Sequence, residues 1–277
     1  LSLQAHVDNF QSSYGQCDTT PFGLSITGDN ITNLSGLADL KTVRGNLDIT
    51  AANRLNNYAG LANLQSIEGR LRISQSGWSN YSVSYYQIDM ASLVSIGGDL
   101  DVSGTRTDRL TSMQFPVLES LGGSINFNEV PNLSSILLPV LTSVPGTLRI
   151  NAVPIKNVDS FSNITTIGGD LTIANSSQLR QLDGFASVTA IGGNALLSNN
   201  DSMVDLHGLA ALGVITGSLS IEGNAALRAC GGVFTVLNAS QVGGEISIAN
   251  NNTGCQSVDD VLATTGALPA RAAYCYT

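Results

Sequence analysis

The segment Gly169-Asp170-Leu171-Thr172-Ile173 decides the fold, because it returns with small variations along almost the whole chain. Its other copies are Gly45-Asn-Leu47-Asp-Ile49, Gly69-Arg-Leu71-Arg-Ile73, Gly98-Asp-Leu100-Asp-Val102, Gly123-Ser-Ile125-Asn-Phe127, Gly146-Thr-Leu148-Arg-Ile150, Gly193-Asn-Ala195-Leu-Leu197, Gly217-Ser-Leu219-Ser-Ile221 and Gly244-Glu-Ile246-Ser-Ile248. From Leu47 to Ile246 the steps are 24, 29, 25, 23, 23, 24, 24 and 27 residues. A period of this size is the signature of a solenoid, in which each repeat forms one coil.

Each repeat predicts a short strand followed by corners around a narrow core. Alternate residues of Leu-x-Ile point inward. Further apolar residues follow at intervals of about three, as in Leu179, Leu182, Phe185, Val188 and Ile191, which is too irregular for a long amphipathic helix. We therefore expect an all-β parallel solenoid of about ten coils, counting an opening coil at Leu24 and Ile26. Its rod would be on the order of 45 Å long, at one strand spacing per coil.

The stack is expected to form one continuous domain, with caps that cover the open ends of the core. Residues 1–23 are interpreted as an N-terminal cap, 24–222 as the solenoid repeats, and 223–277 as the last coil and C-terminal cap. Leu3, Val7 and Phe10 lie at helical intervals and predict a capping helix over residues 1–16. A second short helix is expected at Val258-Asp-Asp-Val261-Leu262.

Glycine and asparagine recur at fixed places in the repeat. The pairs Gly97-Gly98, Gly122-Gly123, Gly168-Gly169 and Gly192-Gly193 predict tight turns with positive φ before each strand. Asparagine recurs just after the strand, at Asn53, Asn128, Asn151, Asn175, Asn199, Asn224 and Asn250. These side chains are expected to stack as a ladder that satisfies backbone groups in the turns.

The repeat pattern resembles a known family. The repeat Leu-x-x-Ile-Gly-Gly-x-Leu-x-Ile, the opening Cys17…Gly23-Leu-Ser-Ile26 followed by Ile31-Thr-Asn-Leu34, and the closing Gly254-Cys255-Gln-Ser are similar to receptor L-domain repeats. Such domains occur in insulin- and EGF-receptor ectodomains, in fungal cell-wall proteins and in secreted or surface bacterial proteins. The resemblance implies a right-handed β-helix related to leucine-rich repeats, with a non-catalytic role. This chain has no Cys-rich module and no kinase, so hormone binding is not carried over.

Composition excludes some functions. The net charge of −9 argues against nucleic acid as a partner, since nucleic-acid binding needs clustered Lys and Arg. No run of 18 apolar residues exists, so no membrane-spanning segment is expected. The chain begins at Leu1 rather than Met, which fits a processed or trimmed protein. We expect a secreted or cell-surface protein without a cofactor.

Four cysteines occur, at positions 17, 230, 255 and 275. Cys17 falls at the opposite end of the predicted rod from the others, so it should lack an intrachain partner and be a buried small apolar residue. Among the other three, one bridge is plausible, and Cys255–Cys275 is favoured slightly over Cys230–Cys255. The ligand spacing does not fit zinc, and no metal site is predicted.

Charged side chains cluster on three neighbouring coils of the predicted strand face. They are Asp48, Arg70, Arg72, Asp99 and Asp101. Opposite charges on adjacent strands suit an ionic ladder that fixes the strand register, and a polar ligand site is the competing interpretation. A general base is missing, because His6 falls in the cap and His207 in a turn, where both are expected to be surface residues. No phosphate-binding loop, nucleophile elbow or metal motif occurs, so we predict no catalytic residues.

One coil carries an aromatic insertion between Ile73 and Ile88. It holds the residues Trp78, Tyr81, Tyr85 and Tyr86, interleaved with Ser and Asn. Insertions in solenoids map to surface loops, often on the binding face, and this composition is typical of protein and sugar contacts. The rings could equally fold back over neighbouring coils. The hypothesis is a ligand-binding patch in which these aromatic residues join Arg70, Arg72, Asp48 and Asp101.

The sequence therefore favours a non-catalytic binding or adhesion protein that recognises a protein or polysaccharide through the solenoid face and the aromatic loop. The first alternative is a carbohydrate-active β-helix enzyme, against which the sparse acid and base inventory argues. The second is a purely structural spacer without a specific partner. The sequence leaves the oligomeric state open.

Overall fold

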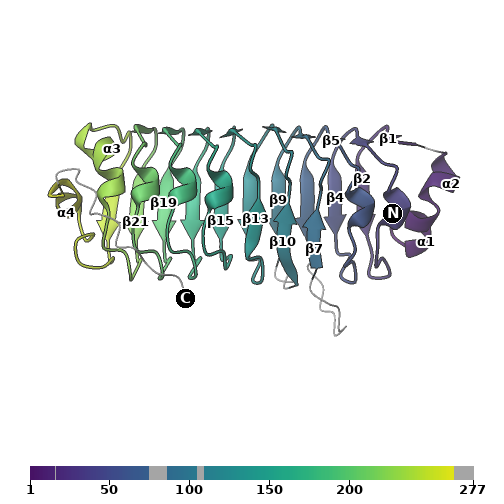
Figure 1. Cartoon of the computed structure of the whole chain (residues 1–277), viewed down its shortest axis with the longest axis horizontal. Helices are drawn as coiled ribbons and strands as arrows, with labels where there is room; N and C mark the ends of the chain where they lie inside the picture. Colours follow the sequence, from purple (N-terminus) through teal and green to yellow (C-terminus); the bar gives the residue numbers. More distant parts are fainter. Residues whose placement is uncertain (16, 75–85, 105–108, 265–277) are drawn as a thin grey trace.

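The computed structural model describes residues 1–15, 17–74, 86–104 and 109–264. The chain forms one elongated stack of coils, with helices α1 and α2 at one end and α3 and α4 at the other (Figure 1). Successive coils lie side by side along the long axis, so the predicted solenoid is confirmed.

One side of the stack is a ten-stranded sheet with one strand from each coil. Its strands pair in parallel throughout. In spatial order they are β2 (Leu24–Thr27), β4 (Leu47–Thr50), β6 (Leu71–Ser74), β9 (Leu100–Ser103), β12 (Ile125–Asn128), β15 (Leu148–Asn151), β17 (Leu171–Ala174), β19 (Ala195–Ser198), β21 (Leu219–Glu222) and β22 (Ile246–Ala249). These are the Leu-x-Ile segments and the opening coil, as the repeat predicted.

A second side consists of very short strands in two sheets. The first sheet holds β1 (Thr19–Thr20), β3 (Thr42–Val43), β5 (Ser66–Ile67), β8 (Ser95–Ile96) and β11 (Ser120–Leu121). The second holds β14 (Ser143–Val144), β16 (Thr166–Ile167), β18 (Ala190–Ile191) and β20 (Val214–Ile215).

The third side changes its secondary structure along the stack. It starts with the 3-10 helices η1 (Ser35–Leu37) and η2 (Ala59–Leu61), continues with the strands β7 (Tyr86–Asp89), β10 (Leu110–Gln114) and β13 (Ser135–Leu137), and ends with η3 (Asp159–Phe161), η4 (Asp183–Phe185), η5 (His207–Leu209) and η6 (Gly231–Val233). The strands β7, β10 and β13 form a three-stranded parallel sheet of their own.

The core is a single column of aliphatic rungs inside the three sides. Leu47 and Ile49 of β4 are fully buried, and so are their counterparts Leu71 and Ile73 in β6. Fully burying such a side chain contributes roughly 1.5–3 kcal/mol. Aromatic rings join the stack on the third side, where the centroids of Phe161 and Phe185 are 5.7 Å apart. Because each rung needs the rung above and below to exclude water, the coils stabilise one another.

The paired glycines serve close stacking rather than positive φ. None of the eight glycines at 97–98, 122–123, 168–169 and 192–193 has a positive φ, so that prediction was wrong. A Cβ on Gly97 would instead overlap the carbonyl oxygen of Glu68 in the preceding coil, and one on Gly122 would overlap that of Gly97. In nine of the ten coils, the exception being the coil of β6, where the described residues end at Ser74, a residue with positive φ follows the strand, at Gly28, Ala51, Gly104, Glu129, Ala152, Asn175, Asn199, Gly223 and Asn250.

A second set of glycines, at the 3-10 helices, also allows adjacent coils to stack closely. A Cβ on Gly60 would overlap the carbonyl oxygen of Leu34, and one on Gly184 would overlap that of Val158. Gly208 and Gly232 repeat this contact one and two coils further on. These glycines recur at the same position of the sequence repeat. Their role in the close approach of adjacent coils is seen only in the structure.

Two asparagine columns run along the stack. In the predicted outer ladder the Nδ2 of Asn151 donates to Asn128 Oδ1 and the Nδ2 of Asn175 donates to Asn151 Oδ1, both at 2.8 Å. Asn199 Nδ2 extends it to Asn175 Oδ1 at 3.3 Å. The second column is buried and consists of Asn200, Asn224 and Asn251. Asn224 therefore does not belong to the outer ladder, so its predicted position there was wrong.

In the buried column each asparagine connects two coils. The Oδ1 of Asn200 accepts from the backbone N–H of Ser176 at 3.0 Å, and its Nδ2 donates to the carbonyl of Ile173 at 2.8 Å. Asn224 repeats both bonds one coil further on, accepting from Asn200 N–H at 3.0 Å and donating to the Leu197 carbonyl at 2.9 Å. These side chains satisfy backbone groups that the turn would otherwise leave unpaired inside the protein.

The N-terminal end begins with two short helices rather than one. They are α1 (Gln4–Asp8) and α2 (Phe10–Tyr14), separated at Asn9. Val7 and Phe10 are buried as expected, but Leu3 precedes α1 and is 46% exposed. The Cys17 side chain is half-buried and its Sγ donates to the Tyr14 carbonyl, so the prediction of a buried Cys17 was wrong.

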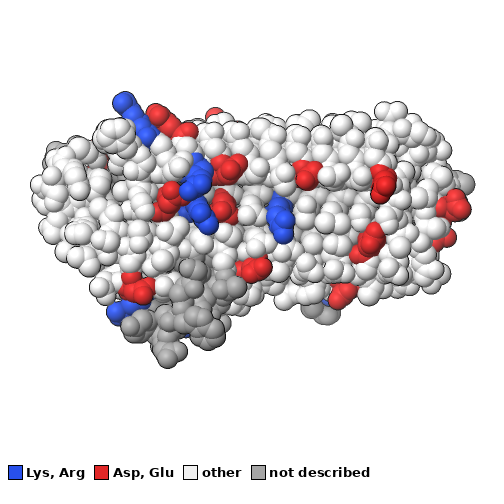
Figure 2. All heavy atoms as spheres, turned by 180° about the vertical axis from the view of Figure 1, so that it is seen from behind, with Lys and Arg blue, Asp and Glu red and all other residues white. Residues whose placement is uncertain are grey.

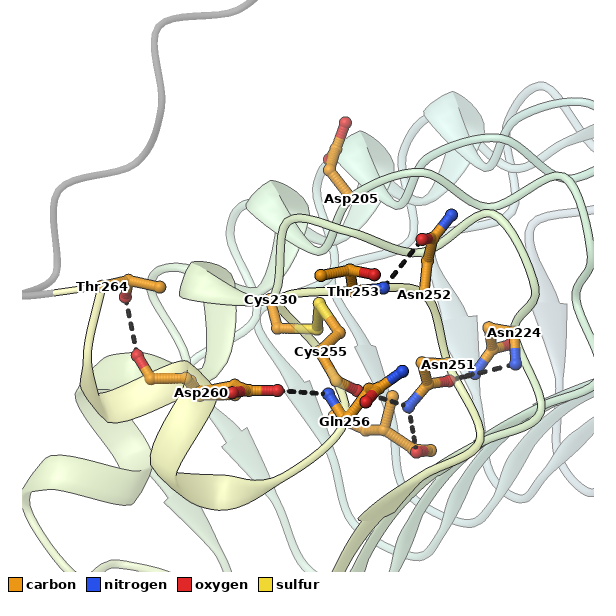
Figure 3. The surroundings of a disulfide bond; sticks show 12 residues. Asp205, Asn224, Cys230, Asn251, Asn252, Thr253, Cys255, Gln256, Asp260 and Thr264 are labelled. Atoms are coloured by element: carbon orange, nitrogen blue, oxygen red, sulfur yellow. Dashed lines mark hydrogen bonds between the residues drawn. A yellow bond between two sulfur atoms is a disulfide. The ribbon is translucent and has the colours of Figure 1, made fainter.

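The C-terminal end is held by α3 (Phe234–Asn238), α4 (Val258–Leu262) and a disulfide. The bond joins Cys230 and Cys255, and both side chains are fully buried (Figure 3). The prediction of Cys255–Cys275 was therefore wrong. The segment after β22 stacks directly on the preceding coil, where Asn252 N–H donates to the Leu227 carbonyl at 3.0 Å. That stacking brings the Cα atoms of Cys230 and Cys255 within 5.7 Å of each other.

Figure 3 shows how this disulfide continues the buried asparagine column. The Nδ2 of Asn251 donates to the Cys255 carbonyl at 2.9 Å, and its Oδ1 accepts from Asn224. Helix α4 follows at once, with Ser257 Oγ accepting from the Asp260 N–H at 3.1 Å as its N-cap.

Candidate ligand-binding face

The outer face of the ten-stranded sheet carries two columns of polar residues, and the strand register confirms both. The mid-strand column is Asp48, Arg72, Asp101, Asn126, Arg149, Thr172, Leu196, Ser220 and Ser247. The pre-strand column, one position before each strand, is Asn46, Arg70, Asp99, Ser124, Thr147, Asp170, Asn194, Ser218 and Glu245.

The pre-strand column is a ladder of side-chain acceptors. In coil after coil, the backbone N–H donates to the side-chain oxygen of the residue one coil before it. The donor and acceptor pairs are Arg70 to Asn46 (3.1 Å), Ser124 to Asp99 (2.7 Å), Thr147 to Ser124 (3.0 Å), Asp170 to Thr147 (3.2 Å), Asn194 to Asp170 (2.6 Å), Ser218 to Asn194 (2.9 Å) and Glu245 to Ser218 (3.0 Å). Short residues with an oxygen acceptor are therefore what the fold requires here, and Asp99 and Asp170 serve the backbone.

Arg70 interrupts this ladder, because a guanidinium has no acceptor to offer the next coil. Its side chain turns to the mid-strand column instead. Arg70 Nε lies 2.9 Å from Asp48 Oδ1 and Arg70 Nη2 lies 3.4 Å from Asp48 Oδ2. This hydrogen-bonded pair with Asp48, assisted by the charges of Asp101 and Asp99, raises the pKa of Arg70.

Arg72 and Asp101 form the second ion pair, with 3.5 Å between Arg72 Nε and Asp101 Oδ2. The Nε of Arg72 is itself buried and has no hydrogen-bond partner among the residues that the structure describes. Asp101 is oriented by Asn126, whose Nδ2 donates to its Oδ1 at 2.9 Å. We call Asp48, Arg70, Arg72 and Asp101 the charged cluster.

The charged cluster lies over β4, β6 and β9, the three neighbouring coils that the repeat register predicts. Its arginines are about 40% exposed (42% for Arg70 and 41% for Arg72), and its aspartates are less exposed. In the view of Figure 2, basic and acidic side chains meet in one group, and further charged side chains, mostly acidic, are scattered among uncharged residues over the rest of that side. The cluster therefore combines the predicted ionic ladder with guanidinium groups that a ligand can reach.

The aromatic insertion joins β6 to β7, since β6 ends at Ser74 and β7 begins at Tyr86. It thus starts from the strand that carries Arg72. Trp78, Tyr81 and Tyr85 lie outside the described residues. Tyr86 opens β7 and pairs with Leu110 of β10. Whether these aromatic side chains join the charged cluster stays a prediction.

The two histidines differ in their surroundings. His6 is exposed in α1. His207 was expected at the surface, but its side chain is only 14% exposed, with Nδ1 at 3.1 Å from Asp205 Oδ1. It lies in η5, on another side of the stack from the charged cluster. Within the described ranges, groups of three or more His, Cys, Asp or Glu residues that could hold a metal ion do not occur.

Comparison with known proteins places part of the chain in a class. The receptor L domain profile matches residues 142–206, which confirms the resemblance seen in the repeat. This class consists of ligand-binding, receptor-type domains. No curated protein matches the chain. In the part of the chain that the structure describes, no helix is both long and apolar enough to cross a membrane.

Proposed function

We propose that the protein is a secreted or cell-surface, non-catalytic binding protein that recognises a protein or polysaccharide through the charged cluster and the neighbouring aromatic insertion. The observation that carries the proposal is Arg70. It stands in a column where the fold uses short acceptors, and it gives up one inter-coil hydrogen bond there. Departures from a structural rule tend to mark functional sites.

The chemistry of the charged cluster fits recognition of a polar partner. A guanidinium carries five N–H donors in a fixed fork, and Asp48 takes two of those of Arg70. The remaining donors suit a carboxylate or a hydroxyl-rich ligand. Asp48 and Asp101 hold the two arginines at fixed places on a rigid sheet, so little side-chain entropy is lost on binding.

The position of the aromatic insertion in the sequence also supports a binding site at the charged cluster. Trp and Tyr supply large, rigid contact areas with polar tips. Because the insertion leaves β6 at Ser74, two residues after Arg72, its aromatic residues are proposed to border the cluster.

The setting outside the cell is supported by the disulfide Cys230–Cys255, since disulfides persist in oxidising compartments. It agrees with the receptor L domain match, because that class of domain is extracellular.

Three variants test the proposal on arrays of glycans and of purified cell-surface ectodomains. The first combines Arg70→Ser with Arg72→Thr, the second combines Trp78→Ala with Tyr85→Ala, and the third is the control Arg149→Thr, in the same mid-strand column. We expect the wild type and the control to bind the same ligands, and the first two variants to bind them at least about tenfold more weakly, as for interface anchors. If both cluster and insertion variants retain every interaction of the wild type, the proposed site is wrong.

A further inference from the structure

A second recessed surface lies away from the charged cluster, along the corner between the ten-stranded sheet and the 3-10 helices. The larger hollow has a volume of about 600 Å³ and is lined by Lys156, Asn157, Asp159, Gln178, Arg180, Gln181 and Ser202. A smaller one of about 140 Å³ shares Asn157 with it and reaches back to Ser134 and Ser135. Together they form a groove that crosses four coils along the axis of the stack, which we call the polar groove.

Two cations stand in register in the polar groove. Arg180 N–H donates to the Lys156 carbonyl at 3.2 Å, so the two residues occupy the same position in adjacent coils. Both side chains are exposed, and neither forms an ion pair with any residue that the structure describes. Asp159 is the single carboxylate in the lining of the larger hollow. Asp183 lies next to this lining, bonded to Gln181, so the positive charge is confined to Lys156 and Arg180, two adjacent cations that attract the anionic groups of a ligand.

The rest of the larger hollow consists of amides and a hydroxyl. Gln181 Nε2 donates to Asp183 Oδ2 at 2.9 Å, which fixes the orientation of that amide. Asn157 Oδ1 accepts weakly from the Asp159 N–H at 3.4 Å, which leaves its Nδ2 available as a donor. Amide groups both donate and accept, so they match hydroxyl groups arranged around a ring.

We propose that the polar groove binds an acidic saccharide, with Lys156 and Arg180 receiving its carboxylate or sulfate groups and the amides receiving its hydroxyl groups. The aliphatic stems of Lys156 and Arg180 offer apolar surface for the C–H faces of the sugar rings. Because coils repeat at one strand spacing, about 4.8 Å, the two cations suit a linear chain that runs along the stack.

A peptide fits the same groove less well. Extended peptides bind by adding a strand to a free sheet edge or by filling apolar pockets. The strands beside the groove, β15, β17 and β19, are paired on both sides, and the larger hollow has only polar residues in its lining. The polar groove and the charged cluster share no residue, so this inference goes beyond the proposed function.

The test compares three hexasaccharides as probes: a uronate oligomer, a heparin-derived sulfated oligomer and a neutral glucose oligomer. Binding is measured by isothermal titration calorimetry with the wild type, the groove variant Lys156→Gln/Arg180→Gln, and the control Lys41→Gln/Arg149→Gln, which loses the same charge elsewhere. Two charge-assisted contacts are removed, so at least about tenfold weaker binding of an acidic probe is expected in the groove variant alone. Raising the salt concentration should weaken wild-type binding of that probe, because both cations are exposed.

Several results would overturn the proposal. They are the absence of binding of both acidic probes, equal affinity for the neutral oligomer, and equal weakening in the groove and control variants. Tighter binding of a glutamate hexapeptide than of either acidic saccharide would assign the groove to peptides instead. The Arg70→Ser/Arg72→Thr variant should keep its saccharide affinity in the groove, which separates a failure here from a failure of the charged cluster. Circular dichroism confirms that each variant is folded.

Discussion

Arg70 and Asp48 belong to adjacent coils and meet side by side, with 2.9 Å between Arg70 Nε and Asp48 Oδ1. The pair is exposed, and exposed pairs of this kind contribute only about 0–1 kcal/mol to stability. At the same time Arg70 leaves the N–H of the next coil without the side-chain acceptor that other coils provide. The fold therefore gains little from Arg70, and its value lies in what the guanidinium presents to a partner.

Replacing Arg70 by Ser should leave stability within about 1 kcal/mol of the wild type. Serine loses the ion pair with Asp48, but it supplies an oxygen for the Asp99 N–H, as Ser124 does for Thr147. Urea unfolding followed by circular dichroism measures this, and Ser124→Arg is the reverse control, because it removes an acceptor from the ladder. A large loss of stability in Arg70→Ser would mean that the arginine is structural.

Asn200→Ala should destabilise the protein by about 2–4 kcal/mol, because two buried backbone groups, Ser176 N–H and the Ile173 carbonyl, lose their partners. Asn151→Ala is the matched control on the outer ladder. Its partners Asn128 and Asn175 reach water, so a loss below about 1 kcal/mol is expected. Equal losses measured in denaturant titrations would contradict the distinction between the two columns.

Gly184→Ala should cost about 2 kcal/mol or more, or prevent folding, because the new Cβ overlaps the Val158 carbonyl of the preceding coil. Gly213→Ala provides the control, since its Cβ would lie 3.6 Å from the Thr189 carbonyl, an ordinary contact. That substitution should be neutral or stabilise by about 0.4–1 kcal/mol through the unfolded state. Thermal unfolding of both variants decides whether coil spacing sets the requirement for glycine.

Loss of the disulfide should destabilise the C-terminal coils by about 3.5 kcal/mol, the loop-closure value for cysteines 25 residues apart. We expect hydrogen exchange in Cys230→Ala/Cys255→Ala to increase from β21 to α4, while exchange from β4 to β15 stays unchanged. Cys17→Ser is the control and should unfold like the wild type. Uniform loss of protection along the whole stack would show that the bond supports more than its own end.

Much of the fold was predictable because the repeat records the core directly. The apolar pattern of Leu171 and Ile173 recurs in the other strands of the large sheet. The number of residues between successive copies of this pattern predicts the register in which β15, β17 and β19 pair. The same register placed Asp48, Arg72 and Asp101 on neighbouring strands, and the two ion pairs of the charged cluster follow from it. Periodicity is informative wherever a property depends on position within the coil.

Contacts between coils were harder to predict, because they depend on how closely two stacked coils approach each other. The sequence of a single repeat does not show this distance. Gly97 was predicted to be glycine because of a positive φ. In the structure, glycine is required there because the Glu68 carbonyl of the preceding coil leaves no room for a Cβ. Asn224 was assigned to the wrong column because the two columns occupy adjacent positions in the sequence. Asn199 faces solvent, whereas the next residue, Asn200, faces the interior, as Asn224 does. The pairing of Cys230 with Cys255 depends on how the last segment stacks, where the repeat has ended.

The acceptor ladder has a consequence for how such a molecule can change over evolutionary time. Apart from the N–H that follows Arg70, each rung is satisfied by the coil before it, so a whole coil could be duplicated or deleted while the N–H of the rung finds an acceptor of the same kind. The length of the stack would then vary in steps of one coil. The distance between the charged cluster and the polar groove would change in the same steps. Partners that engage both surfaces at once would be selected by that separation.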